Sequence, residues 1–174
     1  SPDAFYIIDD AFTLRRDYVE KFCGLLCRNK AGLLWGCSTK VTAVDSDLLK
    51  KMKRAGCIQI DFGVESGSDE SLRRMKKGIT AGQIRKAFDL CRGAGIRTFA
   101  NILLNYPGET REDVIKTVEL LDKIRPSVVS LNIFLPYVGT DIYEESGLNL
   151  KKEEYSLFGA ESYDLIKDPR FRFA

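Results

Sequence analysis

Two adjacent carboxylates, Asp9 and Asp10, directly follow a short apolar run near the start of the chain. Two negative charges side by side are costly unless a cation, a ligand ammonium group or a row of hydrogen-bond donors faces them. The pair therefore indicates a position at which such a group binds. The spacing leaves an alternative open, in which Asp10 caps the following helix and Asp9 is solvated.

A third carboxylate, Glu65, closes another apolar stretch and is flanked by Gly63 and Gly67. Glycines permit close approach of a ligand to the backbone, and a carboxylate in that position suits a ligand amine or sugar hydroxyls. We favour ligand binding for Glu65. Capping of a short following helix by Ser66 or Ser68 is compatible with that function.

Two further apolar runs end in polar segments. The first passes from Trp35 to Ser38 and Lys40, which predicts either a polar lining or an ordinary loop with Trp35 in the core. The second is followed by Asn-Tyr-Pro-Gly-Glu-Thr at 105–110, a rigid turn that brings backbone donors to a helix N-terminus. The alternative for this turn is a tight loop with Thr110 as the helix cap.

The elements that must position these groups are five short, nearly continuous apolar runs, as is typical of strands buried on both faces of a parallel sheet. They are Phe5 to Ile8, Leu33 to Cys37, Cys57 to Val64, Arg97 to Leu104 and Val128 to Leu135. Charged stretches with helical spacing separate them, so the pattern is βαβαβαβαβ. It predicts an α/β fold, either a doubly wound sheet or part of a (β/α) barrel, and both bind ligands at the carboxyl ends of their strands.

The apolar positions predict which face of each helix is buried. The predicted faces are Tyr18, Phe22, Leu25 and Leu26; Leu48, Leu49 and Met52; Ile84, Ala87, Phe88 and Cys91; and Val114, Ile115, Val118 and Leu121. Thr80 with Gln83, and Thr110 with Asp113, have the spacing of capping boxes or close variants. A short extra helix is expected over 69–75.

The composition excludes several classes of function. The 174 residues carry a net charge of only +2, so no strong field points to nucleic acid or an anionic membrane, and no apolar run is long enough to span one. The chain has no histidine, which excludes Ser-His-Asp catalysis and His-ligated zinc within it. Five cysteines, an odd number, suit a reducing compartment, so we expect a cytoplasmic protein.

Taken together and in order, these motifs resemble the radical S-adenosylmethionine (SAM) superfamily, in particular the subgroup that often carries a cobalamin-binding domain upstream. The matching segments are Asp9-Asp10, Trp35-Gly36-Cys37, Gly63-Val64-Glu65-Ser66-Gly67, Asn105 to Thr110 and Pro136 to Thr140. Two positions depart from the pattern, because Asn105 stands where the family usually has glycine and Val138 where it usually has proline. The resemblance covers roughly residues 5–147.

The resemblance implies a partial (β/α) TIM-type barrel with strands two to six and outer helices over 1–147, followed by a C-terminal extension over 148–174. The implied cofactors are SAM and a [4Fe–4S] cluster in the full-length protein, with cobalamin as a further candidate. The cofactor-binding residues implied are Asp9 and Asp10 toward the SAM amino group, Ser38, Lys40 and Glu65 toward its methionine or ribose, and Asn105, Pro107 and Gly108 beside the adenine. No catalytic residue is assigned.

The cluster ligands of the family are absent from this sequence. Members use a Cys-x-x-x-Cys-x-x-Cys loop to hold three irons and cleave SAM to a 5′-deoxyadenosyl radical. Here Cys23 and Cys27 have the first spacing, but position 30 is Lys. We therefore expect no metal ligands in this chain, with the first strand and the cluster loop preceding Ser1 and the fragment alone inactive.

Two other classes of function remain open. Asp9, Asp10 and Glu65 could serve a cluster-free (β/α) or doubly wound enzyme as Mg²⁺ ligands or acid and base groups. A non-catalytic interaction domain could use the basic runs at 50–54 and 73–77 as a docking surface, although solvated helix faces explain those runs as well. We expect a small-molecule substrate, whose identity the sequence does not indicate. The sequence also does not indicate the oligomeric state.

Overall fold

The fold is built on one five-stranded parallel sheet, seen in a computed structural model that describes residues 4–148, 169 and 172. The strands are β1 (Ala4–Ile7), β2 (Leu34–Thr39), β3 (Cys57–Glu65), β4 (Arg97–Leu104) and β5 (Val128–Ile133). Each of the five predicted runs forms a strand, with ends that differ by at most two residues. The predicted extension over 148–174 lies almost entirely outside the described residues.

Helices connect the strands on the long crossovers that parallel pairing requires. They are α1 (Arg16–Arg28), α2 (Ser46–Arg54), α3 (Asp69–Arg74), α4 (Ala81–Gly93), α5 (Arg111–Ile124) and α6 (Asp141–Glu145), with short 3₁₀ turns η1 (Phe12–Leu14) and η2 (Val41–Ala43). Both predicted capping boxes are present, at Thr80 with Gln83 and at Thr110 with Asp113. The short helix predicted after the third strand is α3.

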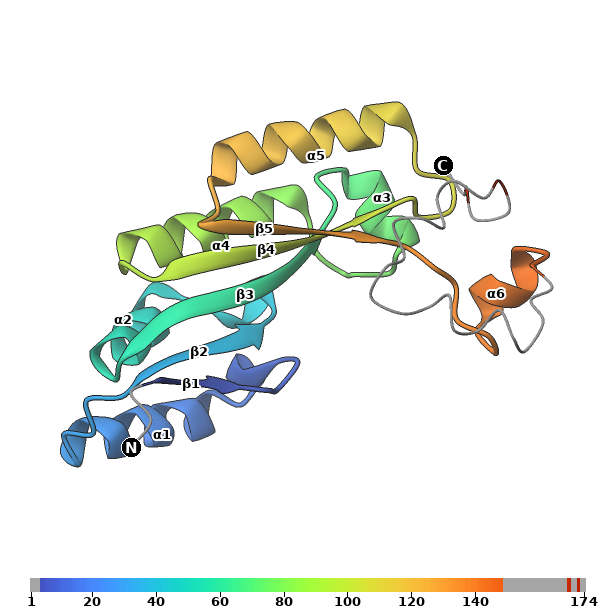
Figure 1. Cartoon of the computed structure of the whole chain (residues 1–174). Helices are drawn as coiled ribbons and strands as arrows, with labels where there is room; N and C mark the ends of the chain where they lie inside the picture. Colours follow the sequence, from blue (N-terminus) through green and yellow to red (C-terminus); the bar gives the residue numbers. More distant parts are fainter. Residues whose placement is uncertain (1–3, 149–168, 170–171, 173–174) are drawn as a thin grey trace.

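The strand order separates the two architectures that the sequence left open. A doubly wound sheet reverses its order at a switch point, whereas here the order is β1-β2-β3-β4-β5, the same as along the chain (Figure 1). The long helices also contact one another in chain order, α1 with α2, α2 with α4 and α4 with α5. The described residues therefore form a curved part of a (β/α) barrel, with β1 and β5 as its edge strands.

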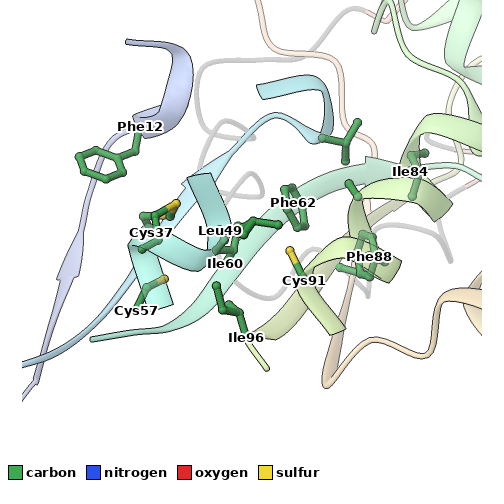
Figure 2. Close-up of a cluster of buried hydrophobic side chains, with 14 of the residues drawn as sticks. Phe12, Cys37, Leu49, Cys57, Ile60, Phe62, Ile84, Phe88, Cys91 and Ile96 are labelled. Atoms are coloured by element: carbon green, nitrogen blue, oxygen red, sulfur yellow. The ribbon is translucent and has the colours of Figure 1, made fainter. Parts of the chain in front are cut away.

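The hydrophobic core lies between the sheet and its helices (Figure 2). Ile60, Phe62 and Val64 alternate along β3 and are fully buried, and the ring of Phe62 lies 5.3 Å from that of Phe88 in α4. Trp35 of β2 is also fully buried, and its Nε1 donates a hydrogen bond of 2.9 Å to the Ala55 carbonyl oxygen. Trp35 is thus a core residue, as expected in the interpretation that treats its segment as an ordinary loop with Trp35 in the core.

The predicted buried faces of α2 and α4 are confirmed, but those of α1 and α5 are wrong in part. In α1 the buried residues are Val19 and Cys23, while Tyr18 and Leu25 are more than half exposed. Apolar residues occur on two sides of that helix, so hydrophobicity alone did not identify the side that meets the sheet.

The first two turns of α5 present polar residues inward. Asp113 and Thr117 are buried, whereas Ile115 and Val118 are exposed. The physical reason is that these two inward polar side chains bind loops that follow β3 and β4. An apolar face therefore points away from the sheet at this end of α5.

Candidate functional site

The parallel sheet brings the predicted polar segments to one edge. Because all five strands run in the same direction, their carboxyl ends lie together, and we call the residues that follow them the loop edge. The loop edge comprises residues 8–10, 40, 65–68 and 105–110. All the predicted cofactor-binding residues except Ser38 belong to it, and Ser38 lies inside β2 one residue before its end.

Asp9 and Asp10 are both exposed after β1. Asp9 Oδ1 accepts a hydrogen bond of 2.9 Å from the Ala11 backbone amide. Neither η1 nor α1 has a side-chain N-cap, so the alternative in which Asp10 caps the next helix is wrong. A cavity of about 390 Å³ opens beside this loop, lined by Asp9, Ala11, Phe12, Leu14, Arg15 and Tyr18.

Glu65 is held at the end of β3 by a break in strand register. Its φ of 61° lies in the left-handed region, and the pairing of β3 with β4 shifts between Gly63 and Glu65. Lys77, which follows α3, donates to Glu65 Oε1 at 2.9 Å. A Cβ on Gly63 would lie 2.7 Å from that same oxygen, so glycine leaves the space that the ion pair occupies.

The buried carboxylate of Glu109 holds the turn after β4 through a backbone hydrogen bond. Glu109 is 6% exposed, and its Oε2 accepts a hydrogen bond of 2.7 Å from the Asn105 backbone amide. Asn105 has a φ of 66°, which asparagine tolerates better than most residues, so its replacement of the family glycine fits the turn. Pro107 and Gly108 continue the turn, and Gly108 has a φ of 77°, in the left-handed region that favours glycine.

Two buried polar atoms beside this turn have no hydrogen-bond partner among the described residues. They are Glu109 Oε1 and Arg74 Nε, one an acceptor and the other a donor. Burial raises the pKa of the Glu109 carboxyl above its ordinary value. Unsatisfied buried polar atoms are rare in folded proteins, so this pair indicates that a water molecule or a ligand group belongs here.

The sheet face opposite the helices carries a polar row that the sequence interpretation missed, and we call it the inner row. Its members are Tyr6, Ser38, Gln59 and Asp61. Tyr6 shares a hydrogen bond of 2.8 Å with Ser38 Oγ, and Gln59 Nε2 donates to Asp61 Oδ1 at 3.0 Å. In a filled barrel these positions would hold bulky apolar side chains, so the row indicates a polar interior.

Electrostatics at the inner row keep the Tyr6 phenol protonated. Partial burial raises the pKa of Tyr6 to about 12, with the Asp61 carboxylate adding to the rise and the Ser38 hydrogen bond opposing it. A period-two signal was present in the sequence of β3, since Gln59 and Asp61 alternate with Ile60 and Phe62. Treating the run as continuously apolar hid that signal.

The basic runs are largely engaged within the fold. Lys51 pairs with Glu20 and Asp47, and Met52 is fully buried. In the second run Arg73 pairs with Glu70, and Lys77 pairs with Glu65 as described. These internal ion pairs weaken the docking-surface alternative.

No metal site is formed within residues 4–148, 169 and 172, where no three cysteine, aspartate or glutamate side chains are grouped closely enough to hold an ion. Asp9, Asp10 and Glu65 therefore do not assemble into the Mg²⁺ site of the alternative enzyme. All five cysteines are free thiols, with Cys23 buried and Cys27 exposed. None of the helices in this described part is long and apolar enough to cross a membrane.

Comparison with protein families gives one match that covers most of the chain. The profile of the Radical SAM superfamily matches residues 3–121. Among curated relatives, the anaerobic magnesium-protoporphyrin IX monomethyl ester cyclase of Rubrivivax gelatinosus is 27% identical over 164 residues, which is 93% of this chain and 29% of the cyclase. The bacteriochlorophyllide d C-8(2)-methyltransferase of Chlorobaculum tepidum is 31% identical over 132 residues, 73% of this chain and 29% of that enzyme.

Solved structures share the fold. The radical SAM methyltransferase TsrM from Kitasatospora setae, with cobalamin and a [4Fe–4S] cluster bound, superposes with a TM-score of 0.74 at 21% identity, over 86% of this chain and 32% of TsrM. The cobalamin-dependent enzyme OxsB, with aqua-cobalamin and SAM bound, gives 0.65 at 20% identity over 83% of this chain and 22% of OxsB. The chain thus spans less than a third of the length of these relatives.

Proposed function

Because this chain belongs to the radical SAM superfamily, we propose that its loop edge forms part of the SAM-binding surface of a radical SAM enzyme. One observation carries the proposal. The Glu65–Lys77 pair and the turn pinned by Glu109 lie at the carboxyl ends of neighbouring strands, and the turn adjoins buried polar atoms that lack partners among the described residues. A polar ligand with both donors and acceptors satisfies that arrangement.

We assign the side chains of the loop edge to separate groups of SAM. Asp9 and Asp10 supply negative charge for its ammonium group, and Lys40 supplies positive charge for its carboxylate. Lys77 holds Oε1 of Glu65, which leaves Oε2 to accept hydrogen bonds from ribose hydroxyls. When bound and reductively cleaved, SAM supplies a carbon-centred radical to the reaction.

The turn after β4 is proposed to flank the adenine. Asn105, Pro107 and Gly108 offer a fixed stretch of backbone, because Glu109 holds the Asn105 amide. Ser38 belongs to the inner row, where it shares a hydrogen bond with Tyr6, and we place it toward the methionine portion of SAM. In these roles the residues of the chain bind and orient the ligand, and none of them transfers a proton.

The iron–sulfur cluster does not fit the residues of this chain. The sequence contains no three-cysteine loop, and Cys23 is buried inside α1, away from any open coordination position. We therefore derive no step through a cluster or through cobalamin. We propose that other parts of the full-length protein hold them, by analogy with TsrM and OxsB, and that these 174 residues alone do not cleave SAM.

For the substrate we propose a small organic molecule lying against the inner row. The near-neutral net charge offers no extended surface for nucleic acid, and the polar inner row suits a compact ligand with hydrogen-bonding groups. Five free thiols suit a reducing compartment, and we propose the cytoplasm.

The test is the affinity of the reconstituted full-length enzyme for S-adenosylhomocysteine, measured by calorimetry with Glu65→Gln. Loss of charge-assisted hydrogen bonds worth about 1.5–3 kcal/mol predicts an affinity roughly 10- to 100-fold weaker. The matched control is Glu70→Gln, because Glu70 lies nearby on α3 but is exposed and paired with Arg73. Equal affinities for wild type and Glu65→Gln would remove Glu65 from the binding surface.

A further inference from the structure

A chain of polar side chains, four of them buried, joins the loop after β3 to the loop after β4 through the first turns of α5. The residues involved are Ser66, Ser68, Arg74, Thr110, Asp113 and Thr117, and we call them the clamp. Ser66, Ser68 and Thr110 belong to the loop edge, Arg74 ends α3, and Asp113 and Thr117 lie in α5. The sequence marked Ser66, Ser68, Thr110 and Asp113 only as helix-capping residues, and no motif linked the two loops to each other.

Asp113 is the centre of the clamp. Its Oδ1 accepts a hydrogen bond from Ser68 Oγ at 2.5 Å, on the β3 side. Its Oδ2 accepts from the Thr110 amide at 3.0 Å, on the β4 side, and from Arg74 Nη2 at 2.9 Å, at the end of α3. A single carboxylate that is 4% exposed therefore binds both loops at once.

The charge of Asp113 is part of this arrangement. Burial alone would raise its pKa, but the hydrogen bonds from Ser68, Thr110 and Arg74 together bring the pKa of Asp113 well below its usual range. The side chain is thus a buried anion stabilised only by its partners. Such a group is expensive to bury unless it is fully hydrogen-bonded, so it fixes the positions of the groups that surround it.

Thr117 forms the second contact between α5 and the β3 loop. Its Oγ1 accepts from the Gly67 amide at 2.8 Å and lies 3.2 Å from Ser66 Oγ, while donating to the Asp113 carbonyl oxygen at 2.9 Å. The backbone approach is very close here, because a Cβ on Gly67 would lie 2.4 Å from the Lys116 carbonyl oxygen. The loop that carries Glu65 is therefore packed directly against α5.

We infer that Asp113 is a positioning residue that holds the β3 and β4 loops in one fixed arrangement, so that Glu65 and the Asn105–Gly108 turn engage a single ligand together. This inference rests on the proposed function for the identity of the ligand, which is an adenosyl sulfonium or its thioether analogue. In this inference Asp113 itself does not touch the ligand. It acts through the geometry of the two loops above it.

The decisive experiment measures the affinity of the reconstituted full-length enzyme for S-adenosylhomocysteine with Asp113→Asn, Thr117→Val and the double variant. Each single variant keeps the shape of the side chain and removes one part of the clamp. We expect each to weaken binding about tenfold, and the double variant to weaken it by much less than the hundredfold product, because both changes release the same loop.

A stability-matched control separates positioning from general destabilisation. Ile84→Val trims a fully buried core side chain of α4 outside the clamp, and it should lower stability while leaving the affinity unchanged. The inference is overturned if Asp113→Asn and Thr117→Val bind as wild type does, if their effects multiply fully, or if Ile84→Val weakens binding to the same extent.

Failure of the proposed function gives a different result. If wild-type enzyme does not bind S-adenosylhomocysteine, the ligand assignment is wrong, and the clamp is judged by urea unfolding of the 174-residue chain. There the stability losses of Asp113→Asn and Thr117→Val should again be less than additive if both side chains belong to one network. Strictly additive losses would show that the network does not act as a unit.

Discussion

Replacing Gly67 by alanine tests how tightly the β3 loop is seated on α5. The φ of Gly67 is not in the left-handed region, so the substitution adds no backbone strain and its cost is purely steric. The new Cβ would lie 2.4 Å from the Lys116 carbonyl oxygen and 2.6 Å from the Thr117 Cα. Real Cβ contacts essentially never fall below 3.0 Å, so loop and helix must separate by at least 0.6 Å, the difference between 3.0 and 2.4 Å.

The magnitude follows from what that separation breaks. Overpacking a filled site costs about 1–3 kcal/mol, and the Gly67–Thr117 hydrogen bond contributes about 1 kcal/mol more. These terms overlap, so we expect a loss of about 2–4 kcal/mol in the free energy of unfolding. For a chain of this size that corresponds to a fall in Tm of roughly 5–15 °C.

The assay is thermal unfolding of the 174-residue chain followed by circular dichroism. Gly93→Ala is the matched control, because Gly93 is the last residue of α4 and no atom lies within 4 Å of the Cβ position. Alanine is the better helix former, so this variant should be neutral or slightly more stable. A Gly67→Ala protein with an unchanged Tm would refute the close seating of the loop on α5.

Two other predictions concern Tyr6 and Asp45. The pKa of Tyr6 is raised to about 12, so its contribution to stability is complete below its ordinary value of 10.0 and is lost as the pH rises toward 12. Urea unfolding across this range should therefore show a steeper loss for wild type than for Tyr6→Phe, and parallel curves would contradict the shift. Asp45 caps α2 by accepting from the Leu48 amide at 2.9 Å, so Asp45→Ala should cost about 1 kcal/mol in urea unfolding, with the exposed Asp122→Ala as the neutral control. Equal losses in the two alanine variants would argue against the cap.

The sequence was sufficient to locate the five strands, the starts of α4 and α5, and the short helix α3. The five apolar runs stand out from the charged helices between them, although the expected burial on both faces is wrong, since β1 and β5 are largely exposed and β3 alternates buried with partly exposed residues. Thr80 and Thr110 marked two helix starts because a capping box is a local interaction that depends on four consecutive positions. The choice between a barrel and an open sheet depended on the strand order. Both architectures are built from βαβ units, and the sequence of those units does not indicate the order of the strands.

The candidate site was predicted less completely, because its partners come from distant positions. Glu65 was identified by its place after a strand, but its ion pair with Lys77 depends on how α3 folds back over the loop. Asp113 was interpreted only as a cap for its own helix. Its second function, binding Ser68, depends on a loop 45 residues earlier in the chain and left no periodic trace in the sequence.

The central position of β3 has a consequence for how the molecule opens. β3 is the longest strand, at nine residues, and it is paired on both sides, whereas β1 and β5 each have one neighbour in the described part of the sheet. Amide hydrogen exchange should therefore begin at the sheet margins and reach β3 last. We therefore expect Glu65 to lie on the slowest-exchanging segment and Asp9 on one of the fastest, so that thermal fluctuations move the β1 side of the loop edge relative to its centre at β3.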